Sequence, residues 1–177
     1  MIDTDRLRLR KPTLDDAEAL HEAYGDPEAM RYIGLGETRD LAATRAWLER
    51  SLERWEADGF GQFVAERKKD DRVVGRVGFL VWDADDWQPG TLAAFGDRAA
   101  IELGWILARE HWGQGYATEA ALACRDHGLG TLGFARLISL IAPGNDRSVR
   151  VAEKIGSRYV RDVSRGDWTA RLFSVQR

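Results

Sequence analysis

The stretch from residue 101 to residue 119 reads IELGWILAREHWGQGYATE, and it decides how the whole chain is interpreted. Its first part, Ile101 to Ala108, is rich in β-branched and aromatic residues, which is typical of a strand. A helix is expected from about Gly115 to Gly128. Because Gly113 and Gly115 stand between the two, the stretch predicts a strand, a glycine loop and a helix in succession.

A glycine loop in this position can bind a phosphate group. Glycines let the backbone approach a ligand closely, and the free N–H groups of a helix start lie at the positive end of its dipole. A P-loop requires Gly-Lys-Ser/Thr, whereas Tyr116 follows Gly115, so this class is excluded. A dinucleotide-binding loop fits poorly, since Thr118 replaces a small residue and the strand Ala135 to Ala142 offers no acid for the ribose.

The rest of the chain mixes strands and helices without repeats, which predicts an α/β fold. Strands are expected around Leu7 and Leu9, at Phe60–Glu66 and Val73–Val81 as an antiparallel hairpin, at Ala135–Ala142, near Ser157–Val163 and at Thr169–Val175. Helices are expected at Leu14–Tyr24, Glu28–Ile33, Asp40–Ala57 and Asn145–Ile155. Asp83 to Gly96 shows no period, so we expect a loop there.

Composition narrows the class of protein. A chain of 177 residues with 44% hydrophobic content is expected to form one domain, residues 1–177. The net charge of −3 comes from 26 basic and 29 acidic residues that are interspersed, which argues against a nucleic-acid partner. Met1 to Arg6 lacks the pattern of a secretory signal, and no apolar run has bilayer length. We therefore expect a cytoplasmic protein without a membrane partner.

The glycine loop resembles the pyrophosphate loop of the GNAT superfamily of acetyl-CoA-dependent N-acetyltransferases, Gln/Arg-x-x-Gly-x-Gly/Ala. Trp112 departs from the usual first residue, but the run from Trp112 to Ala120 is similar to the branch that contains ribosomal-protein alanine/serine N-terminal acetyltransferases. Two further blocks resemble that branch and extend the similarity over nearly the whole chain: Thr4–Arg10 with Asp15–Ala17 and Asp26–Met30, and Asn145-x-x-Ser148 with Glu153–Gly156.

The resemblance implies a mixed, mostly antiparallel central sheet flanked by helices and opened into a V between the strands that carry Trp105 and Leu140. It implies acetyl-CoA as cosubstrate and no metal. The residues that it assigns to acetyl-CoA are the loop amides of Gly113, Gln114, Gly115, Ala117 and Thr118, main-chain groups of Ile106 and Leu107 along the pantetheine arm, and Asn145 with Ser148 nearby. One amide of the strand would polarise the thioester carbonyl. Asn145 is also expected to cap the helix that follows it.

Acetyl transfer to an amine requires a base, and Glu102, at the start of the central strand, is the best candidate, acting through water. The alternative is a strand-end carboxylate in a salt bridge. Many relatives have a tyrosine, which serves as the acid, seven residues after the asparagine, but that position here is Ala152. Tyr116, Ser148, Tyr159 and solvent are therefore all candidates for the acid.

Two further features bear on mechanism and acceptor. Cys124, the only cysteine, lies on a small apolar helix face, which favours a core residue over a covalent acetyl carrier, and we expect direct transfer in a ternary complex. A loop rich in acids and tryptophans suits a cationic amine by charge and cation–π contact, although a solvated acidic loop is the alternative. Its residues are Trp82, Asp83, Asp85, Asp86 and Trp87.

The sequence therefore favours an N-acetyltransferase whose acceptor is a primary amine, either a protein N-terminus or a small molecule. Because Ala152 replaces the usual tyrosine, a non-catalytic CoA-binding regulatory protein of the same fold is the alternative. A dinucleotide-dependent oxidoreductase is a more distant one. The sequence leaves the amine and the oligomeric state open, and a homodimer is compatible with it.

Overall fold

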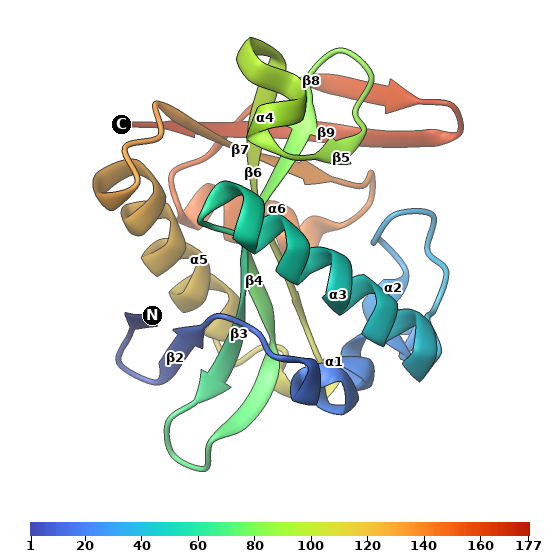
Figure 1. The fold of residues 1–177 in the computed structure, drawn as a ribbon, viewed down its shortest axis with the longest axis vertical. Coiled ribbons are helices and arrows are strands. Elements are labelled where there is room, and N and C mark those ends of the chain that lie inside the picture. The colour runs from blue at the N-terminus through green and yellow to red at the C-terminus, as the bar shows by residue number, and fades with distance from the viewer.

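The computed structural model describes every residue from Met1 to Arg177 and joins all strands into one sheet (Figure 1). The strands are β1 (Ile2–Asp3), β2 (Leu7–Arg10), β3 (Gln62–Arg67), β4 (Arg72–Asp83), β5 (Pro89–Gly90), β6 (Ala99–Leu107), β7 (Arg136–Ile141), β8 (Arg158–Arg165) and β9 (Trp168–Gln176). The helices are α1 (Ala17–Tyr24), α2 (Pro27–Met30), α3 (Leu41–Asp58), α4 (Leu92–Phe95), α5 (Tyr116–Asp126) and α6 (Asp146–Lys154).

The sheet opens between β6 and β7. The strand order is β1-β2-β3-β4-β6-β7-β9-β8, with β5 added beside β4, and only β6 and β7 run parallel. These two strands share one registered pair, Glu102 with Ile138, whereas β6 pairs with β4 over its whole length. The hydroxyl of Ser139 still donates to the carbonyl of Leu103 at 2.7 Å, and beyond this contact the strands separate, which confirms the expected V between the strands that carry Trp105 and Leu140.

Helices cover both faces of the sheet because side chains alternate along its central strands. Val77, Phe79 and Val81 of β4 join the cluster that contains Ala120, Ala121 and Cys124 of α5. On the opposite face, Val64 and Ile106 join a cluster with α1 and with Leu48 of α3. Figure 1 shows α3 crossing in front of β4. The two hydrophobic clusters hold β6 in place from both faces of the sheet. Part of the edge of β6 that faces β7 makes no strand pairing.

Most expected elements are confirmed, with two corrections. The segment Asp83 to Gly96, expected as a loop, contains β5 and α4. Both are very short, and α4 is stabilised locally, since Thr91 accepts the N–H of Ala94 and Asp58 accepts that of Leu92. Elements of this length show no period. The helix expected to reach Gly128 ends as α5 at Asp126, and a π-helical turn follows over His127–Thr131.

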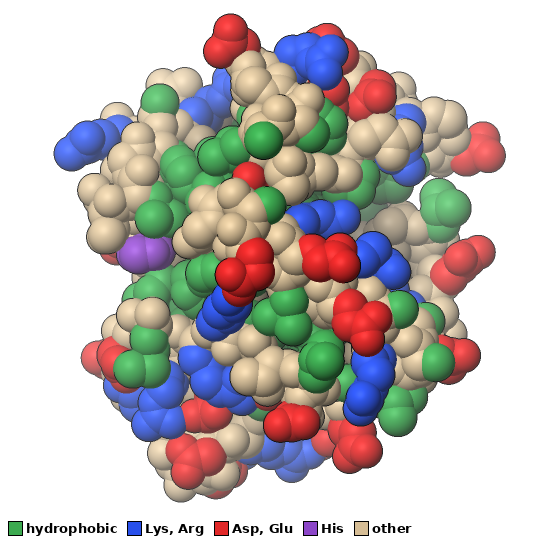
Figure 2. All heavy atoms as spheres, viewed as in Figure 1, with side chains coloured by type: hydrophobic (Ala, Val, Ile, Leu, Met, Phe, Trp, Pro, Cys, Tyr) green, Lys and Arg blue, Asp and Glu red, His purple; other side chains and the backbone are tan.

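The surface carries charges of both signs. On the face that carries α3, basic and acidic side chains are intermixed (Figure 2). None of the helices combines the length and the apolar character that crossing a bilayer demands.

Candidate active site

The loop before α5 presents unpaired backbone N–H groups. Gly115 is the N-cap of α5 with φ of +84°, and no side chain caps the helix. None of the N–H groups of residues 113–118 donates a hydrogen bond within the protein. Gly113 also has a positive φ, +73°, which favours glycine. The loop therefore offers a row of free donors at the positive end of a helix dipole, where a pyrophosphate binds well.

Side chains of the N-terminal segment form hydrogen bonds that hold the glycine loop and the start of α5 in place. Nη1 of Arg6 donates to the carbonyl oxygen of Gln114 at 2.9 Å, and its Nε donates to Oε2 of Glu119 in the first turn of α5 at 2.6 Å. The hydroxyl of Thr4 donates to Oε1 of the same carboxylate at 2.6 Å. These contacts explain in physical terms why the Thr4–Arg10 block and the glycine loop occur in the same chain.

The free edge of β6 lies on the side of the V. Backbone groups of successive residues in a strand point to opposite edges. Because the N–H of Ala108 donates to Val74 of β4, the groups of Ile106 also face β4, whereas those of Trp105 and Leu107 face the opening. The carbonyl of Leu107 accepts Nε1 of Trp112 at 2.9 Å. The main-chain groups of Ile106, which were expected along the pantetheine arm, thus face β4, and those of Trp105 face the opening together with those of Leu107.

Gly75 lets β4 run close to this part of β6. Its φ is +150°, and a Cβ there would overlap the carbonyl oxygen of Ile106. A side chain at this position would push β6 away from β4 where β6 leaves β7, so the glycine preserves the shape of the opening.

Glu102 lies where β6 and β7 begin to separate. Nε1 of Trp82 donates to its Oε2 at 2.7 Å, and the N–H of Leu140 donates to its Oε1 at 3.4 Å. Burial raises the pKa of the Glu102 carboxyl above its usual value, while the Trp82 hydrogen bond, the charge of Arg76 and the Leu140 N–H oppose the rise. Glu102 forms no salt bridge, so the strand-end ion pair that was the alternative is absent. A raised pKa suits a carboxylate that takes up a proton.

A small gap separates Glu102 from Arg76. A Cβ on Gly104 would lie 3.5 Å from Oε1 of Glu102 and 3.4 Å from Nη1 of Arg76. Nε of Arg76 donates to the hydroxyl of Tyr24 at 2.9 Å, which fixes the guanidinium. The glycine thus leaves space between one carboxylate and one cation next to the V.

Asn145 and Ser148 lie together at the start of α6, on the other side of the V. Oδ1 of Asn145 accepts the N–H of Ser148 at 3.2 Å, which confirms the N-cap. Its amide NH₂ makes no hydrogen bond within the protein and is left to donate. Nearby, the guanidinium of Arg147 stacks on Trp112 at 4.4 Å from the ring centre, so α6 contacts the glycine loop.

The structure separates the candidates for the acid. Ala152 is buried with Ile141 and Phe173, so the position of the usual tyrosine belongs to the core. Tyr116 is buried beneath the guanidinium of Arg6, and Tyr159 lies on β8, two strands away from β7, where its hydroxyl donates to Asp162. Ser148, half-buried at the start of α6, is the one side chain of the three that borders the V.

Cys124 is fully buried in the core cluster beneath α5, and burial raises the pKa of its thiol far above the usual value. A thiol that stays protonated is a poor nucleophile. We expect Cys124→Ala to keep turnover within about threefold of wild type, a range suited to a small change in packing. Intact mass after incubation with acetyl-CoA alone should show no acetyl adduct. An adduct on Cys124 that disappears when an amine is added would contradict direct transfer.

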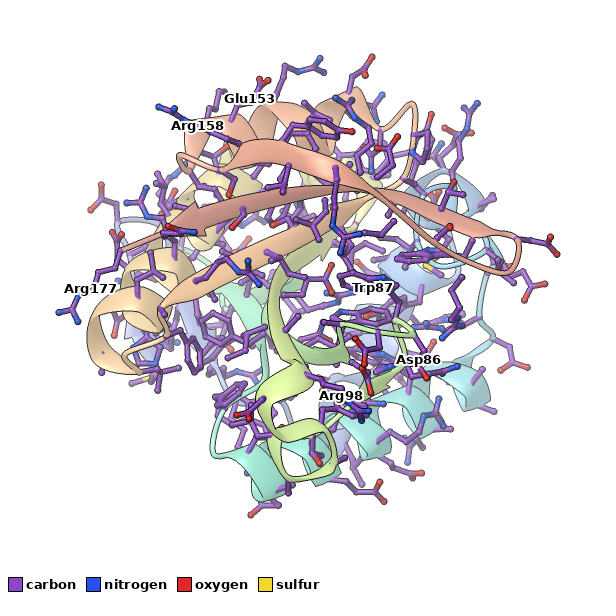
Figure 3. The ribbon with its side chains drawn as sticks, turned by 90° about the horizontal axis from the view of Figure 1, so that it is seen from above. Asp86, Trp87, Arg98, Glu153, Arg158 and Arg177 are labelled. Carbon is purple, nitrogen blue, oxygen red and sulfur yellow. The ribbon has the colours of Figure 1, made fainter.

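Several side chains of the acidic loop are already engaged in contacts within the protein. Asp83 is buried, accepts the N–H of Asp85 and pairs with Arg98 at 2.9 Å. Trp87 is buried in a cluster with residues of β8 and β9, and Figure 3 shows Asp86, Trp87 and Arg98 gathered below the β8–β9 hairpin. Only Trp82 of this loop reaches Glu102, stacking on Trp168 as it does so. The alternative of a structural acidic loop fits this geometry better than an acceptor site.

Comparison with known proteins agrees with this architecture. The family profile described as acetyltransferase (GNAT) domain matches residues 6–158. The chain belongs to the GNAT acetyltransferase family. Among its relatives, the uncharacterized protein YkkB of Bacillus subtilis is 35% identical over 90% of this chain and 86% of that protein. The uncharacterized N-acetyltransferase p20 of Bacillus licheniformis is 30% identical over 86% of this chain and 79% of that protein.

Solved GNAT structures share the fold. An acetyltransferase from Agrobacterium tumefaciens is 29% identical with a TM-score of 0.79, covering 99% of this chain and 94% of that one. At lower identity, 20% and 13%, the fold is shared with AAC(6')-Ib in complex with ribostamycin and coenzyme A and with the ribosomal L7/L12 acetyltransferase RimL in complex with coenzyme A. Their TM-scores are 0.76 and 0.77; they cover 98% of this chain, which in turn covers 94% and 95% of theirs.

Sequence reasoning missed several residues that the structure places beside Glu102 and the opening of the sheet. Arg76, Tyr24 and Trp105 come from three elements whose apolar pattern indicates only core packing, and no motif marks them. The role of Trp105 could have been found from strand alternation once the pairing of β6 with β4 was assumed. Arg76 had one available signal, a charge in the middle of an otherwise apolar strand pattern.

Proposed function

We propose that this protein transfers the acetyl group of acetyl-CoA to a primary amine by direct attack in a ternary complex. The observation that carries the proposal is the juxtaposition of the unpaired N–H groups of residues 113–118 with the edge of β6 that β7 leaves unpaired after Leu103. The first feature suits a pyrophosphate and the second suits an extended arm. Family membership supports acetyl transfer, and relatives named N-acetyltransferases favour an amine as the acceptor.

Acetyl-CoA would be held from both sides of the V. The amides of Gly113, Gln114, Gly115, Ala117 and Thr118 would bind the pyrophosphate, as expected from the sequence. The pantetheine arm would pair with Trp105 and Leu107 as a substitute strand, and the free NH₂ of Asn145, beside Ser148, would contact it from α6. Two more distant GNAT structures were solved with coenzyme A, which supports this cosubstrate.

The chemical step joins the amine to the acetyl group. The amine nitrogen attacks the thioester carbonyl carbon, the new C–N bond forms and the C–S bond breaks, with the electron pair leaving on the sulfur. The N–H of Leu107, which faces the opening, would stabilise the oxyanion, since a preorganised backbone donor acts where the charge develops. The proton of the amine passes to Glu102, directly or through water. The thiolate takes a proton from solvent at the mouth of the V, with Ser148 as the nearest side chain.

Trp82 positions Glu102 and tunes it. The indole N–H stabilises the ionised carboxylate, so its removal in Trp82→Phe should raise the pKa of Glu102 further. Since the base must be ionised, kcat/KM falls as pH drops through that pKa, and the acidic limb should move up by about one pH unit in the variant. The plateau at high pH should change little. An unmoved limb would show that Glu102 does not limit the reaction at low pH.

Thiol release from acetyl-CoA in the presence of amines tests the proposed function. The panel should contain N-terminal peptides, polyamines, amino acids and aminoglycosides, with acetylated product identified by mass. Release that requires an amine supports the transferase. Tight binding of CoA without release for any amine would support the alternative, a regulatory CoA-binding protein. We further propose that the protein acts in the cytoplasm, with which a single, unpaired cysteine is compatible.

A further inference from the structure

Two arginines that lie next to Tyr24 and Trp47 have no acidic partner. The guanidinium of Arg39 lies 4.6 Å from the ring centre of Tyr24 and 5.7 Å from that of Trp47. The guanidinium of Arg76 lies 5.7 Å from the same tryptophan ring and bonds to the hydroxyl of Tyr24. We call Tyr24, Arg39, Trp47 and Arg76 the arginine–aromatic cluster. Arg39 and Arg76 are two of the four half-buried arginines that form no ion pair, the others being Arg54 and Arg171; Arg8, Arg10, Arg67 and Arg125 are all paired.

The arginine–aromatic cluster contains two guanidinium groups, and no acidic side chain pairs with either. Nη1 of Arg39 is buried and has no hydrogen-bond partner. Burial lowers the pKa of Arg39, the charges of Arg76 and Arg50 lower it further, and Tyr24 alone offsets this. A buried cation without a counter-charge is costly, and in natural sites such a charge is usually paired. Guanidinium groups are also the side chains best suited to bind carboxylates.

Arg76 of the cluster lies close to Glu102, the proposed base, at the position of Gly104. Nη1 of Arg76 and Oε1 of Glu102 both lie near the position that a Cβ of this glycine would take, at 3.4 and 3.5 Å. The two opposite charges are held next to the same space without forming an ion pair. A molecule that carries an amine and a carboxylate on neighbouring carbons complements this arrangement, with its amine toward Glu102 and its carboxylate toward Arg76.

We propose that the acceptor is an α-amino acid or a close analogue, whose carboxylate is bound by Arg76 and Arg39 and whose amine faces Glu102. This inference rests on the proposed acetyl transfer and names its substrate class. A peptide N-terminus carries a neutral amide where the carboxylate would lie. Polyamines and aminoglycosides bring more positive charge toward two unneutralised guanidiniums, so they fit the cluster poorly.

Matched acceptors isolate the carboxylate. We would measure kcat/KM by thiol release for L-methionine, L-phenylalanine and L-glutamine and for their α-carboxamides. The wild-type protein should prefer each acid about 10- to 100-fold, the range of one charged hydrogen bond. The carboxamides have the more acidic ammonium group and so present more free amine at neutral pH, which would work against this preference.

Substitutions test whether the arginine–aromatic cluster causes the preference for the acid over the carboxamide. Arg76→Gln and Arg39→Gln should each raise KM for the acids and bring the acid-to-amide ratio to within about threefold, the loss expected for one charged hydrogen bond. Arg45→Gln, a change at an exposed arginine of the same helix α3 that carries Trp47, should keep the wild-type ratio. CoA affinity and the unfolding midpoint show whether each variant is folded. If Arg76→Gln does not fold, Arg39→Gln carries the test.

The outcomes separate the two proposals. Equal rates for acids and carboxamides in the wild-type protein, or a preference that survives in both folded variants, would overturn the amino-acid inference and leave the transferase intact. CoA binding without thiol release for any amine of either panel would overturn the proposed function and the inference with it.

Discussion

Gly115→Val should lower the affinity for CoA by about 100-fold or more, because at least two charged hydrogen bonds to the pyrophosphate would be lost. Gly115 has φ of +84°, and its added Cβ would lie 3.3 Å from Nη2 of Arg6, so a β-branched side chain both strains the backbone and disturbs the Arg6 contact with the loop. The free N–H groups would no longer point together at one ligand. Isothermal titration with CoA measures the effect.

The matched control is Gly133→Val. Gly133 also has a positive φ, +73°, and a Cβ there would meet no atom within 4 Å, but it lies beyond the far end of α5. Both variants carry a similar backbone strain of ~1–2 kcal/mol, so a comparable fall in unfolding midpoint is expected. Only Gly115→Val should lose CoA. If the folded Gly115→Val protein binds CoA as wild type does, the loop is not the pyrophosphate site.

Glu102→Gln should lower turnover by ~10²- to 10⁴-fold, the usual contribution of a general base. The substitution keeps the size of the side chain and an oxygen for Nε1 of Trp82, and it removes only the basic site. Affinity for CoA should hardly change. Because burial raises the pKa of Glu102, the acidic limb of kcat/KM in the wild-type protein should lie above the ordinary glutamate value, with activity rising as pH rises through it. That limb should be absent in the variant.

Asp86→Asn serves as the control for Glu102→Gln. Asp86 is an exposed carboxylate of the acidic loop, and it accepts the N–H of Gln88 within that loop. Its loss should leave both turnover and the pH profile at the wild-type level. Near-normal turnover of Glu102→Gln with an unchanged acidic limb would return Glu102 to a structural role, and a strong effect of Asp86→Asn would restore the acidic loop as an acceptor site.

The sequence could predict the fold and the cofactor loop because both depend on local signals. Gly113 and Gly115 adopt positive φ, which glycine favours, and the helix after them starts within one residue of the expected position. β-Branched and aromatic residues on both sides of a charged turn placed the hairpin β3–β4 to within two residues, and the strands β8 and β9 also lie where they were expected. The family resemblance supplied the V, which no local pattern encodes, because it arises from the loss of pairing between two strands far apart in the chain.

The rest of the site depends on contacts between distant segments. Arg76, Tyr24 and Gly104 come from β4, α1 and β6, and their sequence patterns say only that they lie near a core. The acidic loop had two interpretations at the level of sequence, an acceptor site or a structural loop, and only the contacts of Asp83 with Arg98 and of Trp87 with the β8–β9 hairpin favour the second. Composition shows which charged and aromatic side chains a segment contains. It cannot tell whether contacts within the protein already pair those charges and cover those rings.

We propose above that the free N–H groups of residues 113–118 and the unpaired edge of β6 together hold acetyl-CoA. Amide NMR of the ¹⁵N-labelled protein during a CoA titration tests it residue by residue. We expect the largest shifts on Gly113 to Thr118 and on Trp105 and Leu107, while the signal of Ile106, whose N–H faces β4, should move less. Saturable binding with the largest shifts elsewhere, for example along β8 and β9, would contradict it.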